Sequence, residues 1–148
     1  MEFVVFVGLQ ASGKSTFFRE RFAESHQHVS KDLFPNNRYK NRRQEHLLHA
    51  ALSAGRSVVV DNTNPTPEDR RPLERLGHEY GAKVLGYFFD ASVRECLRRN
   101  ETREGKARVP DVAIYATAKK LVAPSIEEGF DELLCVRLND SAFEVRGC

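Results

Sequence analysis

Short apolar runs alternate with longer amphipathic stretches along most of the chain. The apolar runs are rich in β-branched and aromatic residues, which predicts strands over 2–8, 28–30, 57–61, 82–89 and 132–138. Between them, apolar side chains recur at helical spacing, which predicts helices over 14–24 and about 39–54 and others starting near 67, 93 and 110. This alternation is typical of an α/β protein with a parallel sheet and crossover helices. The first strand is apolar on both faces, as expected at the centre of such a sheet.

Residues that favour helix starts support several of these boundaries. Thr66 is expected to cap the helix that begins with Pro67. Ser92 and Glu95 have the spacing of a capping box for the next helix. Pro72 fits poorly inside a helix, so the helix near 67 is expected to begin later or to kink.

Length and composition describe an ordinary globule. The 148 residues are 41% hydrophobic and 30% charged, with a net charge of +2 and no internal repeat or linker, so one domain over 1–148 is expected. No apolar run approaches the roughly 20 residues of a membrane span. The first eight residues lack a basic region and lead directly into a glycine motif, so we interpret them as a strand and not a signal peptide.

Three cysteines, Cys96, Cys135 and Cys148, are odd in number and show no CxxC spacing. This pattern favours reduced thiols in a cytoplasmic protein.

The segment GLQASGKS (8–15) matches GxxxxGK[ST] between a predicted strand and a predicted helix. Glycines permit the tight turn and a close approach of backbone N–H groups to phosphates. Lys14 would bridge the β- and γ-phosphates, and the Ser15 hydroxyl would bind Mg²⁺. The predicted nucleotide-binding residues of this loop are Gly8, Ala11, Ser12, Gly13, Lys14, Ser15 and Thr16. The loop predicts a site for ATP, or another nucleoside triphosphate, with Mg²⁺.

Other motifs separate the classes of protein that use such a loop. The NKxD and DxxG motifs of switch GTPases do not occur. A translocating ATPase normally needs a longer chain than 148 residues. A kinase needs the loop, a base for the acceptor hydroxyl and a mobile basic lid, and each has a candidate here.

Two aspartates follow predicted strands. Asp32, after the second strand, is a candidate general base, with a helix N-cap as the alternative interpretation. Asp61 ends the third strand and is a candidate for the Mg²⁺ site, with a turn-forming role as the alternative.

The segment RRNETREGKARVP (98–110) is the candidate lid. Six basic residues against three acidic ones lie between Arg94 and Arg108, and Gly105 adds flexibility. Such a segment could supply an arginine to the γ-phosphate, with Arg99 and Arg103 as the predicted nucleotide contacts. A solvated charged surface explains the same composition almost as well.

Together these segments resemble a known family. GLQASGKST, VSKDLF, VVVDNTNPTPEDRR and RVPDVAIYATAKKLVAPSIEEGFDELLCV are similar to the kinase domain of polynucleotide 5′-kinases, as found in polynucleotide kinase/phosphatases and phage RNA-repair kinases. The resemblance covers about residues 3–138. It implies a P-loop NTPase fold: three α/β/α layers around a parallel sheet of about five strands in the order 2-3-1-4-5, with a short arginine-rich lid.

The resemblance also implies roles for individual residues. Lys14 and Ser15 match the phosphate and Mg²⁺ positions, and Asp32 matches the base that activates the 5′-hydroxyl. Asp61 matches the acidic residue after the third strand. Arg103 most nearly matches the catalytic lid arginine, with Arg99 and Arg108 as alternatives because the lid differs in length.

Some positions depart from the family pattern. Ser30-Lys31-Asp32 stands where the base motif usually reads Asn-Arg-Asp, and Pro35 lies where the phage enzyme has an acceptor-contacting arginine, with Arg38 as a substitute. No DxDGT-like phosphatase stretch occurs, so a repair kinase of this kind would work alone or with separate phosphatase or ligase partners.

Basic residues flank the candidate base. RYKNRR (38–43) places four cations and Tyr39 just beyond Asp32, and EDRRPLER (68–75) adds three arginines. Cations with an aromatic ring suit a nucleic acid, although a solvated helix start has the same composition. The predicted acceptor-binding residues are Asp32, Arg38, Arg42, Arg43, Asp61, Asn62, Thr63 and Asn64.

Three functions are consistent with these patterns. The leading hypothesis is ATP-dependent transfer to the 5′-hydroxyl of DNA or RNA. The second is a kinase of a small hydroxylated metabolite, nucleoside or antibiotic. The third is a non-catalytic ATP-binding regulatory module, which would not need Asp32. On the donor side, RLNDSAF (137–143) is expected to be a loop near the adenine.

Overall fold

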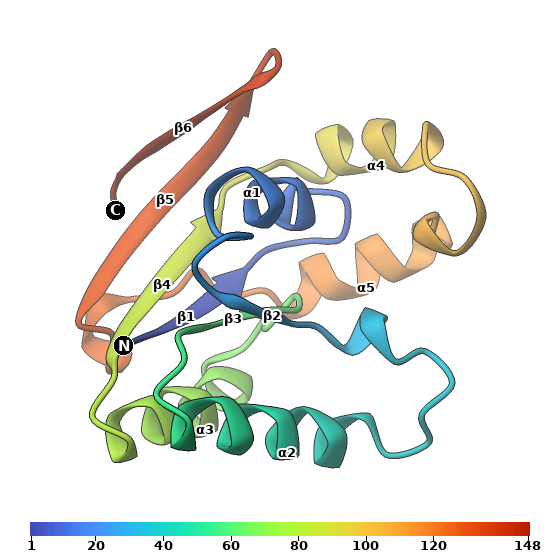
Figure 1. Ribbon diagram of the computed structural model, residues 1–148. Coiled ribbons are helices and arrows are strands. Elements are labelled where there is room, and N and C mark those ends of the chain that lie inside the picture. The colour runs from blue at the N-terminus through green and yellow to red at the C-terminus, as the bar shows by residue number, and fades with distance from the viewer.

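The computed structural model describes all residues 1–148 and contains one sheet of six strands. The strands run in the order β2-β3-β1-β4-β5-β6, and the first five are parallel (Figure 1). They cover β1 (Glu2–Val7), β2 (Gln27–Val29), β3 (Val58–Asp61), β4 (Lys83–Phe89), β5 (Glu132–Asn139) and β6 (Ala142–Gly147). The predicted P-loop NTPase fold and the order of its five parallel strands are confirmed.

Five α-helices and three short 3₁₀ turns connect the strands. The helices are α1 (Lys14–Arg21), α2 (Lys40–Ser53), α3 (Pro67–Glu79), α4 (Val93–Glu101) and α5 (Asp111–Lys120). The turns are η1 (Lys31–Leu33), η2 (Gly105–Ala107) and η3 (Ile126–Glu128). No helix is long and apolar enough to cross a membrane.

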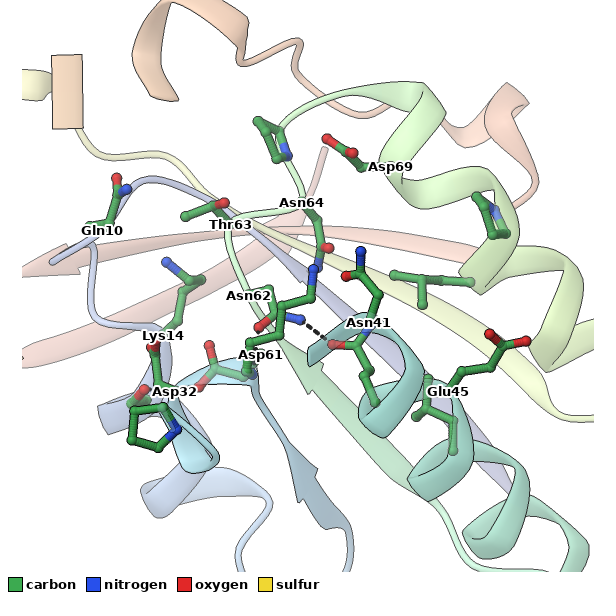
Figure 2. A pocket seen from close by; sticks show the side chains of 18 of the residues that line it. Gln10, Lys14, Asp32, Asn41, Glu45, Asp61, Asn62, Thr63, Asn64 and Asp69 are labelled. Atoms are coloured by element: carbon green, nitrogen blue, oxygen red, sulfur yellow. Dashed lines mark hydrogen bonds between the residues drawn. The ribbon is translucent and has the colours of Figure 1, made fainter. Parts of the chain in front are cut away.

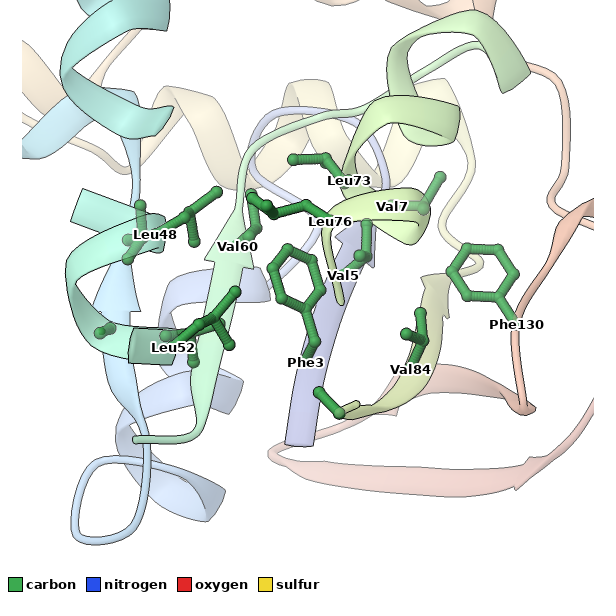
Figure 3. Packing of buried hydrophobic residues seen from close by; sticks show 14 residues of the cluster. Phe3, Val5, Val7, Leu48, Leu52, Val60, Leu73, Leu76, Val84 and Phe130 are labelled. Carbon is green, nitrogen blue, oxygen red and sulfur yellow. The ribbon is translucent and has the colours of Figure 1, made fainter. Parts of the chain in front are cut away.

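Alternating side chains of the central strands build two cores, one on each face of the sheet. Phe3, Val5 and Val7 pack with Leu48 of α2 and Leu73 of α3 on one face (Figure 3). On the other face lies an aromatic cluster in which the rings of Phe6, Phe17, Phe22 and Phe89 are in contact with one another around α1. A third, smaller cluster joins α4 and α5 beneath the glycine loop. The result is the expected arrangement of helices on both sides of a sheet.

The sixth strand was not predicted, and the expected loop at 137–143 is wrong. These residues form a hairpin in which β5 and β6 pair antiparallel, with Asn139 opposite Ala142. The two-residue turn contains Asp140 at φ 55°, a left-handed conformation that aspartate tolerates better than most residues. Phe143 of β6 then packs against Phe17, with ring centroids 5.1 Å apart.

The expectation of three reduced cysteines is also wrong. Cys135 and Cys148 form a disulfide, and Cys96 is free and buried. The two partners are 13 residues apart in sequence, but the hairpin returns Gly147 to a position opposite Leu134. This pairing depends on the sixth strand, which the sequence pattern did not predict, and with a disulfide present the cysteines no longer favour a cytoplasmic location.

Helix α3 begins at Pro67 in spite of its internal proline. Thr66 and Asp69 form a reciprocal capping box, which fixes the start of the helix where the sequence first placed it. Pro72 lies inside the helix on an exposed position and supplies no backbone N–H to it. The expected late start is therefore wrong. At α4, Ser92 accepts the Glu95 N–H, but the Glu95 carboxylate bonds the Ser92 hydroxyl instead of its backbone.

Candidate active site

The glycine loop forms a tight turn between β1 and α1. Ala11 and Gly13 have positive φ values of 62° and 100°, which turn the backbone towards the amino end of α1. A Cβ at Gly13 would lie 3.1 Å from the Phe143 ring, so the β5–β6 hairpin closes one side of the loop. The Gly8 N–H donates to the Thr63 carbonyl at 3.1 Å, which joins the loop to the segment after β3. This is the backbone arrangement that binds phosphates at a helix N-terminus.

Lys14 lies inside the loop with its ammonium group bound to the backbone. Its Nζ donates to the carbonyls of Gly8 at 3.1 Å and Leu9 at 2.7 Å. Burial lowers the pKa of Lys14 from 10.5 to about 8, and the carboxylates of Asp61 and Asp32 oppose this shift. Arg103 lies close enough to lower the same pKa. A phosphate would therefore meet a poorly solvated cation with two carboxylates nearby.

Asp61 connects the loop with the second strand. Its Oδ2 accepts from the Ser15 hydroxyl at 2.8 Å and lies 2.8 Å from Nε2 of His28, whose ring stacks on Phe18. Hydroxyl and carboxylate oxygens are the ligands that Mg²⁺ prefers, and neighbouring ligands in its octahedron lie about 3 Å apart. Ser15 and Asp61 therefore fit a magnesium site. No group of three or more His, Cys, Asp or Glu side chains could hold a metal, so phosphate oxygens and water would complete it.

Asp32 lies on the η1 turn directly after β2. Ser30 caps this turn by accepting the Asp32 N–H at 3.3 Å. The Lys31 N–H donates to Oδ1 of Asn62 at 3.0 Å, and the other side of the Asn62 amide donates to Gln44 at 2.7 Å (Figure 2). The Asp32 carboxylate is exposed. Its position is set by the hydrogen bonds of the turn's backbone, at the N–H groups of Lys31 and Asp32.

One cleft of about 1420 Å³ brings most of the predicted site residues together. The predicted residues that line it are Ala11, Gly13, Lys14, Ser15, Thr16, Asp32, Asp61, Asn62, Thr63, Asn64 and Arg103. Gly8 and Ser12 do not line the cleft, and the Ser12 hydroxyl is buried without a partner. Figure 2 shows the side chains of Lys14, Asp32 and Asp61 on one side of the cleft and those of Asn41 and Asp69 on the other.

The candidate lid is a loop whose two ends are joined by hydrogen bonds. The buried Asn100 exchanges two hydrogen bonds with the backbone of Val109, at 2.7 and 3.1 Å. Inside this loop Arg103 faces the cleft and donates to the Ala107 carbonyl at 3.1 Å. Arg99 instead donates to the Ala11 carbonyl at 3.4 Å, and Arg108 does not line the cleft. Among the three lid arginines, Arg103 is therefore the one at the cleft.

A smaller basic pocket of about 560 Å³ opens beside the cleft. The guanidinium groups of Arg38 and Arg42 lie over the Tyr39 ring, 5.6 and 5.2 Å from its centroid. Lys31 and Asn41 line both this pocket and the main cleft, so the two are neighbours. Arg43 is exposed and lines neither of them.

The cleft also continues between α2 and α3, where its character changes. Leu48, Leu73 and Leu76 form an apolar floor. The carboxylates of Glu45, Glu68, Asp69 and Glu79 stand around it, with Arg75 as a cation. Of the three arginines predicted in 68–75, Arg70 is completely buried and unavailable to a ligand.

Several residues of the site were missed from the sequence. His28, Gln44 and Asn100 have ordinary polar identities and gain their importance from partners 33, 18 and 9 residues away. The signal available for Asn100 is its helical spacing from the apolar residues Val93, Cys96 and Leu97, which places a polar side chain on the apolar face of a predicted helix. No comparable signal marks the other two.

The chain belongs to the AAA domain family AAA_33, whose model matches residues 3–124. It is similar to the bifunctional polynucleotide phosphatase/kinase of Schizosaccharomyces pombe, with 28% identity over an alignment of 137 residues that covers 87% of this chain and 32% of that protein. The chain thus spans about a third of this relative's length.

Solved structures share the fold. A sugar kinase from Janibacter sp. HTCC2649 matches with a TM-score of 0.70 and 19% identity, covering 93% of this chain and 86% of that one. A fungal RNA kinase matches with a TM-score of 0.65 and 16% identity, covering 91% of this chain and 38% of that one. The chain is a P-loop kinase-like domain by fold and by family.

Proposed function

We propose that this chain is an ATP- and Mg²⁺-dependent kinase that phosphorylates the 5′-hydroxyl end of a nucleic acid. The observation that carries the proposal is a cleft and a neighbouring pocket that hold three parts: the phosphate loop with Lys14 and the exposed carboxylate of Asp32 in the cleft, and the basic residues around Tyr39 in the pocket. Similarity to a protein named as a polynucleotide phosphatase/kinase supports the same class of acceptor.

Each part has a role in phosphoryl transfer. Backbone N–H groups of residues 8–15 and the Lys14 ammonium would hold the β- and γ-phosphates. Asp32 would accept the proton of the acceptor hydroxyl. The hydroxyl oxygen of the acceptor then bonds to the γ-phosphorus, and the bond between the γ-phosphorus and the oxygen that leaves with ADP breaks. Arg103 would face the transferring group from the lid. Bound magnesium, held by Ser15 and Asp61, would neutralise charge on the phosphates.

The basic pocket supports a strand as the acceptor. A phosphate next to the terminal nucleoside can pair with Arg38 or Arg42, and the neighbouring Tyr39 ring, which is 55% exposed, could stack with a base. Both arginines border a pocket that shares Lys31 with the cleft, one residue from Asp32. A small neutral acceptor would have no use for these cations.

A second candidate function is the phosphorylation of a small hydroxylated molecule. The continuation of the cleft between α2 and α3 favours it, because carboxylates line an apolar floor there. Such walls repel phosphates and suit hydroxyl or amino groups.

The test is transfer of labelled γ-phosphate from ATP with Mg²⁺ to a 5′-hydroxyl oligonucleotide. The proposal expects label at the 5′ end and none on the same oligonucleotide bearing a 5′-phosphate. Label found instead on nucleosides or small polyols, with none on the oligonucleotide, supports the second function. ATP binding without transfer to any acceptor supports a regulatory module.

A further inference from the structure

Arg70 of α3 is a buried cation outside the nucleotide site. Its side chain is 0% exposed, the largest side chain so deeply buried in the protein. Nε and Nη2 donate to the two carboxylate oxygens of Glu128 at 2.8 and 3.0 Å. Nη1 donates to the Asn64 carbonyl at 2.9 Å. One guanidinium therefore joins α3, the η3 turn and the loop after β3.

Stability alone is a weak reason for this arrangement. Desolvation of two charges offsets much of their attraction, and apolar residues of similar volume often stabilise a protein equally well. What apolar residues cannot supply is a fixed donor for the Asn64 carbonyl. The planar fork of arginine fills both requirements at once, which lysine cannot do.

Asn64 needs such support because its backbone is in an unusual conformation. Its φ is 43°, in the left-handed region that non-glycine residues rarely adopt. Its side-chain amide donates to the Phe6 carbonyl at 2.8 Å, which ties this residue to the end of β1. With the Arg70 bond on the other side, Asn64 is held at both its side chain and its carbonyl.

The residues before Asn64 connect it through hydrogen bonds with the turn that carries the candidate base. Asn62, two residues earlier, accepts the Lys31 N–H at 3.0 Å, and Lys31 precedes Asp32 on the η1 turn. Asp61 at the start of the same loop accepts from Ser15. A shift of the loop would therefore move the carboxylate that accepts the proton and the carboxylate at the magnesium site together.

We propose that Arg70, paired with Glu128, is a positioning residue that sets the geometry of Asp32 through the Asn62–Asn64 loop. The inference rests on the proposed kinase function for its catalytic consequence but not for its structural one. A misplacement of about 1 Å in a catalytic group costs roughly 100-fold in rate, so the expected loss in kcat is about 10- to 100-fold.

The deciding variant is Arg70→Met combined with Glu128→Gln, which removes both buried charges and keeps an acceptor for the Ser125 N–H that Glu128 now binds. Arg70→Met alone leaves Glu128 without its partner and is expected to lower Tm. The double variant is expected to regain most of that Tm while kcat stays 10- to 100-fold low and the Kd for ATP stays within about twofold. Arg70→Lys, which keeps the charge without the fork, is expected to show the same loss in kcat. The control is Lys83→Met with Glu132→Gln, an exposed ion pair (3.1 Å) at the far ends of β4 and β5.

Hydrogen exchange followed by mass spectrometry supplies a readout that needs no acceptor. The double variant is expected to exchange at least fivefold faster in peptides covering 30–33 and 61–65, with β1 and β4 unchanged. If kcat returns together with Tm, or if exchange in these peptides does not change, Arg70 has no positioning role and the proposal is overturned. If the wild-type protein transfers phosphate to no acceptor, the proposed function fails, and the exchange result still decides the inference.

Discussion

The two walls of the cleft are built in different ways. The phosphate wall is one continuous segment, residues 8–16, whose backbone turns and helix start would bind the phosphates under the proposed function. The acceptor wall is assembled from the η1 turn, the start of α2, the loop after β3 and α3, joined by side-chain hydrogen bonds such as Asn62–Gln44. The first wall depends on local conformation and the second on tertiary contacts. Changes at the first should therefore abolish nucleotide binding, whereas changes at the second should alter transfer and acceptor choice.

The largest expected effect is at Asp32, on the acceptor wall. Asp32→Asn removes the proton acceptor without changing the shape of the turn, so kcat should fall about 10²- to 10⁴-fold. The Kd for ATP should stay the same, because the phosphate wall is intact. Glu20→Gln, an exposed carboxylate on α1 outside the cleft, serves as the control. Full transfer by Asp32→Asn, measured by γ-phosphate labelling, would remove Asp32 as the base.

Lys14→Ala tests the phosphate wall, where a change should affect ATP binding as well as transfer. Loss of the buried ammonium should lower transfer about 10²- to 10³-fold and also weaken ATP binding, measured by calorimetry. If transfer fell while ATP affinity stayed at the wild-type value, the division between the two walls would be wrong.

The basic pocket is expected to affect the acceptor alone. Arg38→Ala with Arg42→Ala should raise the KM for an oligonucleotide about tenfold and make the slope of log(kcat/KM) against log[salt] shallower by roughly 1. Arg56→Ala, an exposed arginine just beyond the opposite end of α2, is the matched control. Equal effects of the two variants would mean that general charge, and not the pocket, attracts the strand.

The pH dependence of ATP affinity is a further test of the phosphate wall, because it reports on the protonation of Lys14. Since burial lowers the pKa of Lys14 to about 8, the free protein increasingly holds a neutral amine above that pH. ATP affinity should therefore fall about tenfold between pH 7 and pH 9. Lys14→Met should remove this dependence, and an unchanged slope in that variant would assign it to another group.

A separate prediction concerns the stability of the fold at Glu74, a buried residue of α3. Burial, with Glu128 nearby, raises the pKa of Glu74 from 4.5 to about 7, and its Oε2 has no hydrogen-bond partner. The folded protein then binds this proton more tightly than the unfolded chain. Consequently the free energy of unfolding should fall by up to about 3 kcal/mol as the pH rises from 4.5 to 7, and level off above.

Glu74→Gln keeps the shape of the side chain and removes its titration. Urea unfolding at pH 5 and pH 8 should show a smaller difference in this variant than in the wild-type protein. The same pH dependence in both would place the titrating group elsewhere.

The same contrast between local and tertiary structure explains what the sequence predicts. The five parallel strands and the helices between them follow from apolar periodicity, and their presence is confirmed. The phosphate loop follows from a contiguous motif, and its binding of a nucleotide stays a prediction. The missed features depend on distant partners. The sixth strand has only half-buried and exposed positions, so its periodicity is weak, and the Cys135–Cys148 disulfide depends on that strand. Arg70 and the exposed Arg71 beside it are the same type of residue, so the sequence does not distinguish them. Arg70 is buried because it pairs with Glu128, 58 residues away.

Competition between two acceptors tests the central claim most directly. Wild-type protein, labelled ATP and Mg²⁺ are mixed with equal concentrations of a 5′-hydroxyl oligonucleotide and a neutral polyol, and the label on each product gives the ratio of kcat/KM values. An acceptor site that uses the basic pocket predicts label on the oligonucleotide in at least tenfold excess, with the excess reduced in the Arg38→Ala, Arg42→Ala variant. Label predominantly on the polyol would contradict the claim. It would favour the part of the cleft between α2 and α3, which is lined by carboxylates, as the acceptor site.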